Sequence, residues 1–103
     1  MSIEQLLTEK YGSAGIMSGE ELLLRHPDAL RFIDDCEDLG LTILGMNFYE
    51  REEGHTVEVS STDWSSLVEE PDAFEQSIRE ARSLIGKGLP DDADLVSFVV
   101  REP

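Results

Sequence analysis

One stretch, from Gly40 to Trp64, limits the possible folds more than any other part of the chain. It reads GLTILGMNFYEREEGHTVEVSSTDW, which is an apolar run, a charged turn that contains a glycine, and a second, shorter run rich in β-branched residues. Leu44, Met46 and Phe48 follow the two-residue period of a strand with one buried face. The stretch therefore predicts a β-hairpin at the centre of a small sheet.

The register of this hairpin follows from its turn. Arg51-Glu52-Glu53-Gly54 is predicted as a four-residue turn, because glycine tolerates a positive φ. Closing the hairpin there places Phe48 opposite Val57 and Met46 opposite Val59, so that both strands share one apolar face. The opposite face then carries polar side chains, namely Asn47, Tyr49, Thr56, Glu58 and Ser60.

Helices are expected on both sides of the hairpin. Capping-box patterns predict helix starts near Ser2, Ser18 and Asp72. Pro27 suits the first turn of a further helix, which runs to about Leu39 and ends at Gly40. The predicted helices therefore cover residues 2–11, 19–25, 27–39 and about 72–85, the last with an apolar stripe of Phe74, Ile78, Ala81 and Ile85. Residues 94–102 are predicted as a closing strand.

The resulting order of elements, α, α, α, β, β, α, β, predicts an α+β fold. A third strand that pairs beside the first gives a three-stranded antiparallel sheet of order 2-1-3, with the helices packed on one face. We expect a single domain, in which residues 1–26 form an N-terminal helical extension and residues 27–103 form the core. A chain of 103 residues supports one core of this size.

The charge of the chain excludes some classes of partner. Asp and Glu number 23 against 8 Lys and Arg, a net charge of −15. Direct binding of nucleic acid or of an anionic membrane needs a basic patch, so neither is expected. Such a charge keeps a protein soluble, or it steers a basic partner toward it. One cysteine and the lack of a secretion signal or an apolar span predict a cytoplasmic protein.

No catalytic or metal-binding pattern stands out in the sequence. The chain has no His-x-x-x-His or Cys-x-x-Cys spacing, which argues against a structural zinc site. Cys36 lies on an apolar helical stripe, where a buried structural thiol is expected rather than a nucleophile. Asp91, Asp92 and Asp94 resemble part of a calcium loop but lack its terminal Glu. We therefore expect no enzymatic activity, no cofactor and no metal.

The candidate site is a partner-binding surface around the hairpin. Carboxylates at its tip and exit would meet a basic cleft, and two aromatic side chains would anchor the contact. Trp64 has a structural alternative, which is packing at the edge of the core, and the acidic tip would also serve to keep a sheet edge soluble. The candidate residues are Tyr49, Glu50, Glu52, Glu53, Glu58, Asp63, Trp64, Glu69 and Glu70.

The order of features from about Leu30 to Val100 resembles a known family. A helix with Cys36 ends at Gly40-Leu41, and Ile43-Leu44-Gly45 opens a hairpin that leads to Ser60, Ser61 and Trp64. The acidic pair Glu69-Glu70 before Pro71, a helix near Ile78 and a closing strand around Phe98 and Val99 complete the pattern. This order resembles the small acidic immunity proteins of bacterial toxin systems, in particular that of the colicin which cleaves tRNA at the anticodon.

The resemblance implies a protein that binds its cognate nuclease and blocks the RNA-binding cleft with carboxylates in place of phosphates. This chain differs in its N-terminal extension, in its longer and more acidic hairpin tip, and in Asp63 before Trp64. We expect an immunity protein, monomeric when free, that inhibits a basic bacterial toxin of the ribonuclease type. An acidic chaperone or adaptor for a secreted effector, which would dimerise, is the alternative, and a cryptic enzyme is a third.

Overall fold

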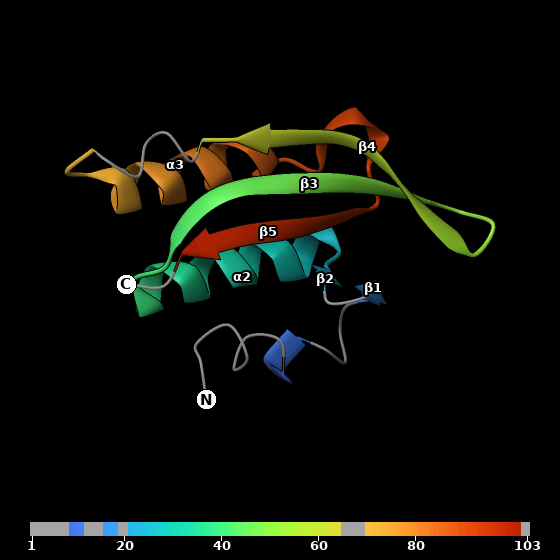
Figure 1. Cartoon of the computed structure of the whole chain (residues 1–103), viewed down its shortest axis with the longest axis horizontal. Helices are drawn as coiled ribbons and strands as arrows, with labels where there is room; N and C mark the ends of the chain where they lie inside the picture. The colour runs from blue at the N-terminus through green and yellow to red at the C-terminus, as the bar shows by residue number, and fades with distance from the viewer. Residues whose placement is uncertain (1–8, 12–15, 19–20, 65–69, 102–103) are drawn as a thin grey trace.

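The computed structural model describes residues 9–11, 16–18, 21–64 and 70–101 (Figure 1). Residues 9–11 are helical, and the remainder of the predicted helix at residues 2–11 lies outside the described residues. The elements that follow are β1 (Ile16–Ser18), β2 (Glu21–Leu23), α2 (His26–Leu39), β3 (Thr42–Glu52), β4 (His55–Asp63), α3 (Ala73–Ile85), the 3₁₀ turn η2 (Pro90–Asp92) and β5 (Leu95–Arg101).

The central sheet confirms the predicted topology. Its strand order is β4-β3-β5, and both neighbours of β3 run antiparallel to it. Helices α2 and α3 lie side by side behind the sheet (Figure 1), and their buried residues join those of β3 in one core. Phe32 of α2 stacks on Phe98 of β5 with 4.7 Å between ring centroids. The chain therefore has the expected α+β fold, with the order 2-1-3 when its three longest strands are numbered along the chain.

The helices that flank the hairpin follow the sequence closely. In α3 the predicted stripe is inward, since Ile78, Ala81 and Ile85 are buried and Phe74 packs against the core. Helix α2 ends where predicted, because Gly40 adopts a left-handed φ of 74° that a side chain would disfavour. The N–H groups of Gly40 and Leu41, directly after the helix, donate hydrogen bonds to the carbonyls of Glu37 and Cys36, respectively.

The predicted register of the β3–β4 hairpin is wrong. Glu52 pairs with His55, so the turn holds only Glu53 and Gly54, at φ of 45° and 88°. A two-residue turn with a positive φ at both positions has a backbone twist that matches the twist of the two strands it connects. The predicted four-residue turn allowed a positive φ at Gly54 only, whereas Glu53 adopts one as well. In the observed register Val57 lies opposite Glu50, not opposite Phe48, and its side chain is 43% exposed.

Two irregularities in β3 and β4 further shift the pattern. A bulge at Val59 moves the register, so that Phe48 pairs with Ser60. A second one at Leu44, seen against β5, exchanges the inward positions, since Ile43 is fully buried and Leu44 only partly so. The prediction that Leu44 belongs to the buried face therefore holds only in part. Ile43, which a strict two-residue period puts on the opposite face, is fully buried instead.

The predicted helix at residues 19–25 is wrong. Residues Glu21–Leu23 form β2, which pairs with β1, and Leu24 bridges to Val96 of β5. A three-leucine run is too short for periodicity to separate strand from helix. Tyr11 and Leu24 are both buried in the core cluster. Of the described residues before α2, Tyr11 and Leu24 thus belong to the main core, whereas the prediction placed residues 1–26 outside it.

Candidate partner-binding surface

The tip of the β3–β4 hairpin extends beyond the rest of the sheet (Figure 1). Strand β5 pairs with β3 only as far as Tyr49, so β3 and β4 continue from there as a two-stranded ribbon. Asp94 holds the base of this ribbon: its N–H donates to the Tyr49 carbonyl at 2.8 Å, and its carboxylate accepts from the Arg51 N–H at 3.0 Å. The ribbon is thus presented from a fixed base.

Carboxylates dominate the surface of the ribbon. Residues 50–58 contain four carboxylates and one arginine, a formal charge of −3 with His55 neutral. Glu52, Glu53 and Glu58 are exposed, and Glu50 is partly so. Among the residues that the structure describes, the ion pairs involve Lys10, Arg31 and Arg82, and none of them reaches Glu50, Glu52, Glu53 or Glu58. The negative charge of the ribbon is therefore not neutralised from within.

The outer face of α2 is acidic too, but four of its five carboxylates have a cationic partner. Arg82 of α3 donates to Glu37 through two nitrogens, at 3.0 and 3.1 Å, and to Asp34 at 2.6 Å. These hydrogen bonds lower the pKa of Glu37. Lys10 pairs with Asp35 at 2.7 Å, and Arg31 lies 3.5 Å from Asp28. Cations of the described residues thus pair with the α2 carboxylates other than Asp38, which distinguishes these carboxylates from those of the ribbon.

Asp35 also ties the first described residues to α2. Partial burial on its own would raise the pKa of Asp35, but hydrogen bonds from Lys10 and from the Tyr11 hydroxyl outweigh burial and hold the pKa below its ordinary 3.8. Burial and the same carboxylate raise the pKa of Tyr11 well above its ordinary value. The Tyr11 ring in turn packs on Phe32 with 5.6 Å between centroids.

The structure brings some of the predicted site residues together. Tyr49 and Glu58 are direct cross-strand partners, and Asp63 lies on the same face of the sheet, opposite Gly45. Trp64 follows β4 directly, and its N–H donates to the Leu44 carbonyl at 2.9 Å. Its side chain packs against the core, with the indole Nε1 buried and without a hydrogen-bond partner among the described residues. Trp64 therefore packs at the edge of the core, as its structural alternative expects.

Other predicted site residues lie far from the tip. Glu70 is exposed just before α3. Figure 1 shows the start of α3 at the opposite end of the molecule from the hairpin turn, and the longest extent of the molecule is 44 Å. Glu69 lies outside the described residues. The nine residues of β4 separate the turn from Trp64 by about 30 Å. The predicted residues thus follow the length of β4 and do not form one compact patch.

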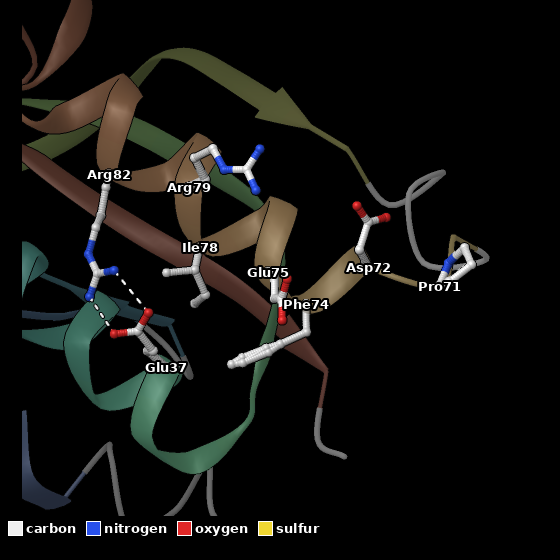
Figure 2. Close-up of a pocket in the computed structure, with 8 residues that line it drawn as sticks. All are labelled: Glu37, Pro71, Asp72, Phe74, Glu75, Ile78, Arg79 and Arg82. Atoms are coloured by element: carbon white, nitrogen blue, oxygen red, sulfur yellow. Dashed lines mark hydrogen bonds and ion pairs between the residues drawn. The ribbon is translucent and has the colours of Figure 1, made fainter.

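A surface groove that the sequence argument missed lies between α3 and the end of α2 (Figure 2). It has a volume of about 670 Å³, and the side chains of Phe74 and Ile78 supply its apolar part. Charged groups surround them, including the Arg82–Glu37 pair drawn in Figure 2. The groove forms only where the two helices pack together, so no local sequence pattern could predict it. Its lining holds neither a histidine nor a cysteine.

The described residues offer few groups for catalysis. Burial raises the pKa of the Cys36 thiol to about 12, and the Asp35 carboxylate adds to this shift, so the thiolate nucleophile does not form near neutral pH. His26 is engaged through Nε2 with the Ile85 carbonyl at 2.6 Å. Within the described ranges, no three His, Cys, Asp or Glu side chains are grouped so as to hold a metal ion. None of the helices described has the length and apolarity to cross a bilayer.

Comparison of the chain with protein-family models, with curated proteins and with solved structures found no match.

Proposed function

We propose that this chain is an immunity protein, which binds a basic toxin domain of the ribonuclease type and blocks its substrate cleft. The observation that carries the proposal is the contrast between two acidic surfaces. Lys10, Arg31 and Arg82 pair with four of the five α2 carboxylates, whereas none of the ion pairs of the described residues reaches the ribbon carboxylates Glu50, Glu52, Glu53 and Glu58. A row of uncompensated carboxylates on a narrow projection has the charge and shape to occupy a cleft built for phosphates.

The test is protection of a bacterial host from the toxin domain encoded beside this chain in its source genome. Co-expression of the chain should restore growth, and the purified pair should form a one-to-one complex. The ribbon variant Glu50→Gln/Glu52→Gln/Glu53→Gln/Glu58→Gln should lose protection, and its association rate should fall by one to two orders of magnitude at low salt.

A matched variant separates the ribbon from net charge. Asp38, Asp72, Glu75 and Glu80 are exposed and lie on α2, on α3 or at the start of α3, outside the ribbon, so changing them to the corresponding amides removes the same formal charge. This control should still protect and should bind within a fewfold of the original rate. Equal loss in both variants would show that net charge alone drives association. The absence of any protection would overturn the proposed function itself.

A further inference from the structure

The two outer strands of the sheet differ in how their edges are covered. On the β5 side, Leu24 exchanges two hydrogen bonds with Val96, at 2.8 and 2.9 Å, so another segment of the chain lies along that edge. On the β4 side, no strand of the described residues pairs with the outer edge. An edge of this kind presents backbone N–H and C=O groups that are ready to pair with another chain.

The sequence of β4, HTVEVSSTD, contains no lysine, arginine or proline. What protects its open edge is the carboxylates of Glu58 and Asp63 and the bulge at Val59. Carboxylates repel an acidic strand but attract a basic one. The N–H of Trp64 donates to Leu44 of β3, and antiparallel pairs alternate between bonded and non-bonded positions. Thr62 therefore directs its backbone groups toward β3, and Ser61 directs them outward. Ser61 is also exposed.

Charge decides between the candidate occupants of this edge. A second copy would bring a further charge of −15 and would place one row of carboxylates beside another, which destabilises cross-strand pairs. Glu58 and Asp63 lie on the same face of β4, so a neighbouring strand with a basic residue at alternate positions would meet both. The edge therefore favours a basic segment over a second copy of this chain.

We propose that β4 accepts an extended basic segment of the partner as an additional antiparallel strand of the sheet. The proposal rests on the proposed function and specifies how the partner is held. Such a strand would follow β4 for about 30 Å, from the acidic turn past Glu58 to Asp63. The added strand would thus contact Glu58 and Asp63, which are predicted site residues too far apart to form one compact patch. The bulge at Val59 interrupts the regular edge and so fixes the register of the added strand.

The probe is a synthetic nine-residue peptide in which lysine alternates with valine, with both ends blocked. Added to the ¹⁵N-labelled full chain, it should shift the amide resonances of β4 and slow hydrogen exchange at Ser61. The same peptide with every internal amide N-methylated keeps its charge but cannot form a strand ladder, and it should bind at least tenfold more weakly. A peptide with glutamate in place of lysine should not bind.

Substitutions at Ser61 test the same contact from the protein side. Ser61→Pro removes an outward N–H without removing a bond to β3, because proline is tolerated at outward positions of edge strands. It should weaken binding of the lysine–valine peptide about tenfold, whereas Ser61→Ala, which keeps the N–H, should not. Circular dichroism and denaturant unfolding would verify that both variants fold. If Ser61→Pro does not fold, the N-methylated peptide still decides the question with the unaltered chain.

Several outcomes would overturn the inference. Equal binding of the methylated and unmethylated peptides, with strong salt dependence, would show charge attraction without strand addition and would leave the proposed function standing. Tight binding of the glutamate peptide would contradict the role of charge. A dimer of the free chain in sedimentation that Ser61→Pro abolishes would assign the edge to a second copy. If the unaltered chain does not protect a host from the toxin domain, by contrast, the proposed function is overturned regardless of the peptide-binding results.

Discussion

At the scale of single residues, Ser77 shows how one hydroxyl connects a helix to the sheet. Ser77 is fully buried in α3; its Oγ donates to the Phe74 carbonyl at 2.8 Å and accepts from the Ile43 N–H at 3.0 Å. The Ile43 amide lies beside the irregularity at Leu44. Ser77 therefore supplies an acceptor to a buried donor where the β3–β5 ladder is irregular.

Ser77→Ala should lower the free energy of unfolding by about 1–3 kcal/mol, because it leaves the buried Ile43 N–H without an acceptor. Urea denaturation measures the change. Ser83→Ala is the matched control, since Ser83 is exposed on the same helix and alanine is the better helix former. A loss of stability in Ser83→Ala equal to that in Ser77→Ala would contradict the assigned role of the hydroxyl.

Asp35→Asn should destabilise the fold at neutral pH by about 1–3 kcal/mol, because it removes a charged acceptor from Lys10 and Tyr11. The folded-state pKa of Asp35 lies below 3.8, so its contribution is present above that pH and is lost as the pH falls through the folded-state value. The stability difference between the two proteins should therefore shrink below pH 3.8.

Asp38→Asn is the control for this pH dependence. Asp38 is exposed in the last turn of the same helix, where a carboxylate opposes the helix dipole. Its replacement should leave stability unchanged or raise it by some tenths of a kcal/mol. A difference between wild type and Asp35→Asn that stays constant from pH 7 to pH 3 would show that ionisation of Asp35 is not what stabilises the fold.

At the scale of elements, the hairpin turn combines strain with charge. Glu53 adopts a φ of 45°, where residues other than glycine are uncommon and asparagine is enriched. Asn-Gly is also the preferred pair for this turn. Glu53→Asn should therefore raise the free energy of unfolding by about 0.5–1 kcal/mol. Guanidinium denaturation measures the gain.

Glu52→Gln separates the backbone effect from the charge. It removes one neighbouring carboxylate at a strand position outside the turn, so it should change stability far less than Glu53→Asn does. Both variants should slow association with a basic partner by a similar small factor. A hairpin destabilised by Glu53→Asn would contradict the turn geometry.

The elements also show which parts of the fold the sequence predicts. Helices α2 and α3, the cap at Gly40 and the strand order follow from periodicity and from the connection lengths. The hairpin register did not, because it depends on a positive φ at Glu53 and on bulges at Leu44 and Val59. Strand β2 was also missed, since Leu22, Leu23 and Leu24 suit either period.

The sequence predicts that the candidate site is acidic and exposed, but not how its residues are arranged in space. Exposure of the tip carboxylates follows from their place in a charged turn. The wide separation of Glu70 from the tip, the balancing of the α2 carboxylates by Arg82, and the groove beside Phe74 all depend on how distant segments pack. Local patterns carry no information about such contacts.

At the scale of the whole molecule, a net charge of −15 acts on stability and association in opposite directions. Salt screens the repulsion among carboxylates, so the free energy of unfolding should rise between about 10 mM and 500 mM NaCl. The rate of association with a basic partner should fall over the same range. Urea denaturation and stopped-flow fluorescence measure the two trends. Two trends of the same sign would contradict this account of the charge.

The bridge between Leu24 and Val96 has a consequence for assembly. Unlimited edge-to-edge assembly of a sheet, as in fibrils, requires each copy to have two edges that are free to pair with other copies. Among the described residues, Leu24 occupies the β5 edge at Val96, and no strand pairs with the outer edge of β4. If a partner adds a strand to β4 as proposed, the complex should therefore contain one partner strand for each copy of this chain.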